Sequence, residues 1–230
     1  MLKKKSVTSS DIITLFMDYV VENNSKPTSV DSFIKYCDID EKSFYQYFNS
    51  FEKIEKKIFK KIFKSSLGIL NENSDFLLFD NRNKILSLYF TLFESLSLNR
   101  EYVAIVLSGY ENKLKALSKL SGMKKSYFSF LDLLELDSIL LKFEGIESFQ
   151  KNTIKKTAWI QLLLILEFWL EDTSDSFEKT DIFIEKSINT SFDLLEHSFL
   201  NSFIDLSKFL YKEKFQSTSI TFKNRNKENS

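Results

Sequence analysis

The sequence predicts an all-α protein, in which an N-terminal three-helix domain precedes a larger C-terminal helical bundle, with about nine helices in total. The 230 residues include only one proline and four glycines. Because these two residues punctuate turns, their scarcity indicates long uninterrupted helices. Apolar residues also recur at spacings of three and four, the period of one helix face, and no strand-like alternation rivals that pattern.

Residues that cap helices mark where the first two begin. Ser9 or Ser10 is the expected N-cap of the first helix, because a serine hydroxyl accepts a hydrogen bond from the free N–H groups of the first turn. This helix is expected to end in the polar stretch 23–27. The second helix is short. It is expected to begin at Thr28, where residues 28–31 resemble a capping box, and to stop near Tyr36.

A tight turn leads to a third short helix over residues 41–48, for which Asp40 is the expected N-cap. Ser50 is then expected to cap a fourth, long helix from Phe51 to about Glu72, with isoleucines and phenylalanines on one face and lysines on the other. One longer helix followed by two short helices around a tight turn is the layout of a helix-turn-helix domain. The second short helix of such a domain fits the major groove of DNA.

Beyond residue 73 the sequence predicts long amphipathic helices, at about 80–98, 101–120, 124–141, 148–170 and 177–211. Ser121 and Gly122 are expected to end the second of these. The most apolar window, 158–170, is too short and too polar to span a membrane, so we expect a buried core helix and no membrane partner. Four segments follow: a helix-turn-helix domain (1–50), a connecting helix (51–72), a larger helical domain (73–214) and a disordered tail (215–230).

Composition argues against several classes of function. The formal net charge is zero, so DNA binding would depend on a local basic patch. The single cysteine, Cys37, excludes an intramolecular disulfide and a cysteine-based zinc site, and the single histidine, His197, leaves no second imidazole for a metal pair. No nucleophile–base pair or glycine-rich phosphate loop is present. We therefore expect a cytoplasmic protein that is not an enzyme and needs no metal or cofactor.

The stretch from Phe16 to Ile54 resembles the DNA-binding domain of the TetR family of transcriptional regulators. Residues 28–34, Thr-Ser-Val-Asp-Ser-Phe-Ile, are similar to the second helix of that family, and residues 43–48, Ser-Phe-Tyr-Gln-Tyr-Phe, are similar to its recognition helix. The resemblance covers about the first quarter of the chain. It implies a homodimeric regulator, a repressor, that binds a palindromic operator in double-stranded DNA and is relieved by a small apolar ligand.

The resemblance also implies roles for individual residues. Ser43 and Gln46 would face the groove, Tyr45 and Tyr47 would lie near phosphates, and Lys42 would reach a phosphate or a base edge. The complete DNA-binding set is Thr28, Lys42, Ser43, Tyr45, Gln46, Tyr47 and Lys53. The core of the small domain would comprise Phe33, Ile34, Phe44 and Phe48.

Two features depart from the family pattern. The family usually has a lysine near the start of the fourth helix, where this chain has Phe51, with Lys53 two residues later. The turn before the recognition helix carries Asp38, Asp40 and Glu41, which would repel phosphates unless they cap a helix. Residues 1–64 hold twelve lysines and nine acidic residues, a local balance of only +3. The alternative function is a TetR-fold protein that binds a lipid or a protein partner instead of DNA; a purely structural helical adaptor is a third.

The C-terminal half suggests a ligand site and a dimer interface. Trp159, Leu162, Phe168 and Trp169 are candidates to line a cavity for an apolar ligand between helices. Plain core and dimer packing is the more frequent role of such residues. The helices expected at 148–170 and 177–211 carry more apolar residues than one face can bury, so two such helices from each chain would form the dimer interface.

Overall fold

The computed structural model describes residues 7–107, 113–134 and 147–196, and within these ranges it contains α-helices and no strand, which confirms the all-α fold. The described α-helices number eleven rather than about nine, because the short α5 was not predicted and the helix expected at 101–120 is described in two pieces. They are α1 (Ser9–Glu22), α2 (Val30–Tyr36), α3 (Glu41–Tyr47), α4 (Phe51–Asn71), α5 (Ser74–Leu78), α6 (Asn81–Ser97), α7 (Arg100–Leu107), α8 (Lys113–Lys119), α9 (Ser121–Leu133), α10 (Glu147–Glu171) and α11 (Glu178–Glu196).

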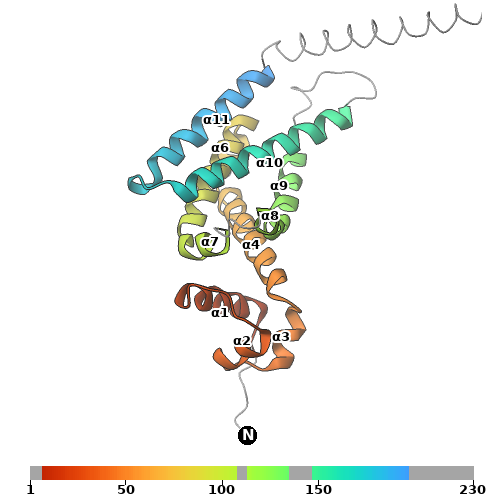
Figure 1. Ribbon diagram of the computed structural model, residues 1–230. Coiled ribbons are helices and arrows are strands. Elements are labelled where there is room, and N and C mark those ends of the chain that lie inside the picture. Colours follow the sequence, from red (N-terminus) through yellow and green to blue (C-terminus); the bar gives the residue numbers. More distant parts are fainter. Residues whose placement is uncertain (1–6, 108–112, 135–146, 197–230) are drawn as a thin grey trace, which may run out of the picture.

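The helices form two groups that α4 connects. Helices α1–α3 lie at one end of the molecule, and α4 runs from them into a bundle in which it packs against α6 and α9 (Figure 1). Helices α10 and α11 lie at the opposite end (Figure 1). None of the described helices combines the length and hydropathy of a membrane span. The predicted tail at 215–230, and the last helix beyond residue 196, lie outside the described residues.

Side-chain caps fix the helix starts of the N-terminal domain. Asp40 and Ser50 cap α3 and α4 as predicted. The other two caps lie one residue or more from the predicted positions. Thr8, not Ser9 or Ser10, caps α1, because its hydroxyl accepts the Asp11 N–H at 3.2 Å while the Asp11 carboxylate accepts the Thr8 N–H at 2.8 Å. In α2 the cap is Ser29, not Thr28, since Ser29 forms the reciprocal pair with the residue three positions later.

Aromatic rings form the core of this domain. Phe33 and Phe44 are fully buried, and Ile34 and Phe48 nearly so, as predicted. Phe51 belongs to the same core: its ring stacks on Phe16 with centroids 5.3 Å apart and meets Phe33 edge-on at 5.7 Å. The departure from the family pattern at this position therefore has a packing reason, because an aromatic ring fills the space between α1 and α2.

The packing of α9 on α4 corrects the expectation for residues 121–122. Ser121 and Gly122 begin α9 instead of ending the preceding helix. A Cβ atom on Gly122 would lie 2.7 Å from the carbonyl oxygen of Lys56 and 3.1 Å from Cβ of Lys60. The glycine is needed because the two helix backbones meet there. The helix predicted at 124–141 thus starts three residues earlier, and it ends at Leu133 rather than near residue 141, because Leu134 has an extended backbone.

Polar groups lie among the apolar residues of the bundle. The hydroxyls of Tyr89 on α6 and Tyr127 on α9 are hydrogen-bonded at 2.9 Å in a fully buried position. Arg100 at the start of α7 donates to carbonyl oxygens at the end of α10, including that of Trp169 at 2.8 Å. Its guanidinium also lies 4.7 Å from the Trp169 ring centroid. These contacts tie α7 to the carboxyl end of α10.

Candidate nucleic-acid interface

Helix α3 presents a polar and aromatic face to solvent. Phe44 points into the core and is fully buried, whereas Lys42 and Gln46 are exposed. Tyr45 and Tyr47 are 50% and 40% exposed, a large amount of aromatic surface for a helix of seven residues. The helix lies in the three-helix end of the molecule, away from α10 and α11 (Figure 1). Its outward side chains combine a cation, an amide and two phenols, all of which bind phosphates or base edges.

Ser43 differs from the other predicted contacts on α3. It is half-buried, and both its backbone N–H and its hydroxyl donate to the Asp40 carboxylate, at 3.0 and 3.3 Å. The hydroxyl is therefore already used in the helix cap. The same geometry shows that Asp40 stabilises the amino end of α3, which leaves Asp38 and Glu41 as the exposed acidic residues of the turn.

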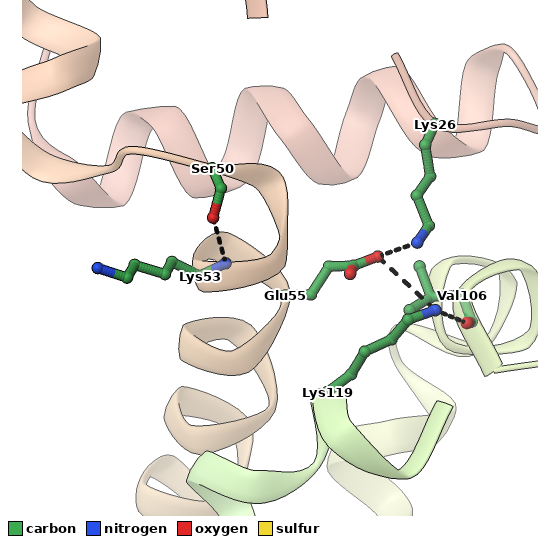
Figure 2. Close-up of polar contacts among 6 residues, drawn as sticks. All are labelled: Lys26, Ser50, Lys53, Glu55, Val106 and Lys119. Atoms are coloured by element: carbon green, nitrogen blue, oxygen red, sulfur yellow. Dashed lines mark hydrogen bonds and ion pairs between the residues drawn. The ribbon is translucent and has the colours of Figure 1, made fainter. Parts of the chain in front are cut away.

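Thr28 and Lys53 are exposed on either side of this helix in the sequence. Thr28 precedes the capped start of α2, with its hydroxyl 3.4 Å from that of Ser32. Lys53 lies in the first turn of α4, and its side chain extends away from Glu55 (Figure 2). Six of the seven predicted DNA-binding residues are thus exposed, Ser43 being the exception.

Two lysines of this region are engaged in ion pairs. Lys26 is paired with Glu55 at 2.6 Å and Lys56 with Glu52 at 2.7 Å. Within the described residues, Lys42 and Lys53 form no ion pair. Lys57 adds a third cation near α3, because its ammonium lies 5.0 Å from the ring centroid of Phe48 at the end of that helix.

Glu55 is a polar residue whose role the sequence reading missed. It is 2% exposed and lies on the inner face of α4. Its spacing carried a signal, because it follows Phe51 by four residues and precedes Phe59 by four, which places a carboxylate on the apolar face.

The candidate ligand residues differ in burial. Trp159, Leu162 and Trp169 pack in the core, at 7%, 1% and 0% exposed. Phe168 is 39% exposed, and its ring lies 5.0 Å from that of Phe183 on α11. A cavity of about 650 Å³ lies elsewhere, between α1 and the joint of α6 and α7. Its lining includes none of these four residues.

The chain is similar to known proteins in part of its sequence and in its fold. Residues 84–210 match the protein-family model described as "Tetracyclin repressor-like, C-terminal domain", which spans more than half of the chain. Among solved structures, the fold is similar to that of a protein from Syntrophomonas wolfei str. Goettingen assigned to the TetR family of transcriptional regulators. The TM-score is 0.57, with 15% sequence identity over 79% of this chain and 93% of that one. The comparison with curated proteins found no match.

Proposed function

Because the chain belongs to the TetR-type family of transcriptional regulators, we propose that it binds double-stranded DNA sequence-specifically and represses transcription. The observation that carries this proposal is the outer face of α3, where Lys42, Tyr45 and Gln46 are exposed above a buried Phe44. A glutamine side chain can pair with an adenine edge, and lysine and tyrosine can bind phosphates. Asp40 supports the proposal because its carboxylate is engaged in the helix cap.

We further propose that the active form is a homodimer built on α10 and α11. Three residues at helical spacing on α10, Ile160, Leu164 and Phe168, are 56%, 53% and 39% exposed, and Ile182 on α11 is 43% exposed. A contiguous apolar stripe of this kind indicates a protein contact. A two-fold dimer would present two copies of α3 to related half-sites, which requires a palindromic operator.

The proposed regulation is a small apolar ligand bound between the C-terminal helices, which changes the separation of the two α3 helices. The proposal assigns residues 1–50 to DNA binding, 51–72 to the connection and 73–214 to ligand binding and dimerisation. It places the protein in the cytoplasm and assigns it no enzymatic reaction. The packing of α4 against α6 and α9 supports it, because a shift in the bundle would reach the N-terminal domain through α4.

A second function is favoured by one observation on α5. Leu77, Leu78 and Phe79 are 62%, 85% and 39% exposed in a row. These exposed apolar side chains support the alternative of a TetR-type protein that binds a lipid or protein partner and no DNA. The exposed carboxylates of Asp38 and Glu41, beside α3, support it as well because they would repel phosphates.

Selection of genomic fragments by the purified full-length protein separates the two functions. A repressor is expected to enrich a palindrome and to bind it less tightly as salt is raised, because phosphate contacts release counterions. Lys42→Ala and Tyr45→Ala should weaken binding roughly tenfold or more without lowering the thermal unfolding midpoint. The absence of an enriched palindrome and of salt-dependent binding would favour the lipid or protein partner.

Leu164→Glu tests the dimer. It should convert the protein to a monomer in sedimentation experiments and abolish cooperative binding to the palindrome, because a buried charge without a partner destabilises the interface. Leu117→Glu, the same substitution at a position 42% exposed on α8, is the control and should remain dimeric. A dimeric Leu164→Glu protein would place the interface elsewhere.

A further inference from the structure

The carboxylate of Glu55 lies where the N-terminal domain meets the bundle. One oxygen, Oε1, is 2.6 Å from Nζ of Lys26 and 3.8 Å from Nζ of Lys119 (Figure 2). Lys26 belongs to the connection between α1 and α2, and Lys119 is the last residue of α8. One buried carboxylate thus pairs with a cation from each of the two groups of helices.

The two lysines differ in their surroundings. The side chain of Lys119 is 12% exposed, and its ammonium also donates to the carbonyl oxygen of Val106 on α7 at 2.5 Å. The side chain of Lys26 is 39% exposed. Burial lowers the pKa of Lys119 to about 8, against the opposing attraction of Glu55. Lys119 therefore has a second contact within the bundle besides its pairing with Glu55, whereas the ion pair of Lys26 is with Glu55.

We propose that Glu55 is a positioning residue through which the bundle holds the α1–α2 connection, and with it the exposed Thr28 and the amino end of α2. A movement of α8 would then reach the DNA-binding surface through Lys119, Glu55 and Lys26, and not only through a movement of the whole of α4. This inference rests on the proposed DNA-binding function only where it concerns the operator.

The backbone around Lys26 favours this transmission. Pro27 separates Lys26 from Thr28, and a proline both fixes its own φ and restricts the residue before it. Pro27 is itself buried. A displacement of Lys26 is therefore carried to Thr28 instead of being absorbed by rotation of the intervening backbone.

A purely stabilising ion pair explains the arrangement less well. Replacing a buried ion pair by apolar residues is often neutral or stabilising, so such a pair is weak support for a stability role. Here two ammonium groups share one carboxylate, and the hydroxyl of Tyr102 is buried without a hydrogen-bond partner among the described residues. Burial, and then the charge of Glu55, raise the pKa of Tyr102. The cluster is thus imperfectly satisfied in this arrangement.

Hydrogen exchange on the free full-length protein tests the inference without DNA. Lys119→Met should speed amide exchange about tenfold in residues 23–29, in the other group of helices, because the carboxylate loses its anchor in the bundle. Coupling between two sites is reciprocal, so Lys26→Met should speed exchange in residues 117–122. Lys119→Arg, which keeps the cation, should restore protection of residues 23–29 to within about twofold of the parent.

Lys155→Met is the matched control, because Lys155 is similarly buried at 15% exposed and pairs with Asp132 inside the bundle. Lys155→Met should leave the rate of amide exchange in residues 23–29 unchanged. The inference is overturned if Lys119→Met changes exchange only near its own helix, or if Lys155→Met speeds residues 23–29 equally.

A selected operator gives a second readout. Lys119→Met should weaken binding several-fold with an unchanged salt slope, because no phosphate contact is lost, whereas Lys53→Ala should lower the slope by about one. A reduced slope in Lys119→Met would also overturn the inference. If no operator is found, the proposed function fails, while the exchange experiment still decides the role of Glu55.

Discussion

The N-terminal domain and the C-terminal bundle are held together by different means. In the N-terminal domain, rings from four helices meet in one aromatic cluster, and each of α1–α4 begins at a side-chain cap. In the bundle, α5 and α6 also begin at side-chain caps, Asn73 and Asp80. Helix α9, however, has Leu120 at its N-cap position with no side-chain cap, and its place is set by close backbone contact with α4. The N-terminal domain thus combines ring packing between helices with a cap at every helix start, whereas α9 in the bundle depends on close backbone packing against α4.

The aromatic cluster should give the largest effect if this comparison is correct. Phe33→Ala removes a fully buried ring that meets Phe16, Phe44 and Phe51. We expect the free energy of unfolding to fall by about 3–5 kcal/mol in urea titrations followed by circular dichroism. Phe90→Ala, at a position 38% exposed on α6, should cost much less. Similar losses in the two variants would contradict the central place of the cluster.

Two glycines test the backbone contact in the bundle with the same substitution. Gly122→Ala should lower the free energy of unfolding by about 1–3 kcal/mol, because its Cβ would overlap the carbonyl of Lys56. Gly68→Ala, in the interior of α4 with nothing within 4 Å of the new atom, should raise it by about 0.5–1 kcal/mol. Thermal unfolding measures the change in stability of each variant. If both variants are stabilised, or both are destabilised, the close approach of α9 to α4 is contradicted.

The same difference explains how far the sequence predicts the structure. The caps at Asp40 and Ser50 could be predicted because capping depends on residues within one helical turn. Gly122 was misassigned as a helix end because its role depends on Lys56, sixty-six positions earlier. Of the candidate site, the exposure of Tyr45 and Tyr47 concerns one short helix, whereas the pairing of Lys26 with Glu55 joins residues twenty-nine positions apart and has no local signal.

Asp172, between α10 and α11, provides a further local cap in the bundle. Its carboxylate accepts the hydroxyls of Ser174 and Thr180 at 2.7 and 2.6 Å, and the N–H of Thr180 at 2.9 Å. Burial raises the pKa of Asp172, but these hydrogen bonds outweigh it and hold the pKa well below the usual 3.8. As the pH falls, the Asp172 carboxylate is therefore protonated in the unfolded chain before it is protonated in the folded chain. The contribution of Asp172 to the free energy of unfolding is thus present above about pH 4 and is lost as the pH falls below that value.

Asp172→Asn should consequently cost about 1–3 kcal/mol at about pH 7 and less at about pH 3, measured by urea unfolding at each pH. Asp193→Asn, at an exposed position on α11, serves as the control and should show a smaller cost at about pH 7. A cost for Asp172→Asn that grows as the pH falls would contradict the direction of the pKa shift.

The smallest expected effect comes from two neighbouring residues of the N-terminal domain. The hydroxyl of Ser29 accepts the Ser32 N–H at 3.1 Å and caps α2, whereas Thr28 is exposed and makes only a long contact with the same residue. Ser29→Ala should lower the free energy of unfolding by about 1 kcal/mol. Thr28→Ala should leave it within about 0.5 kcal/mol and weaken only operator binding, which anisotropy titrations measure. If Thr28→Ala instead destabilises the fold and Ser29→Ala does not, the cap lies at Thr28, and the local interactions that distinguish this domain from the bundle are wrongly assigned.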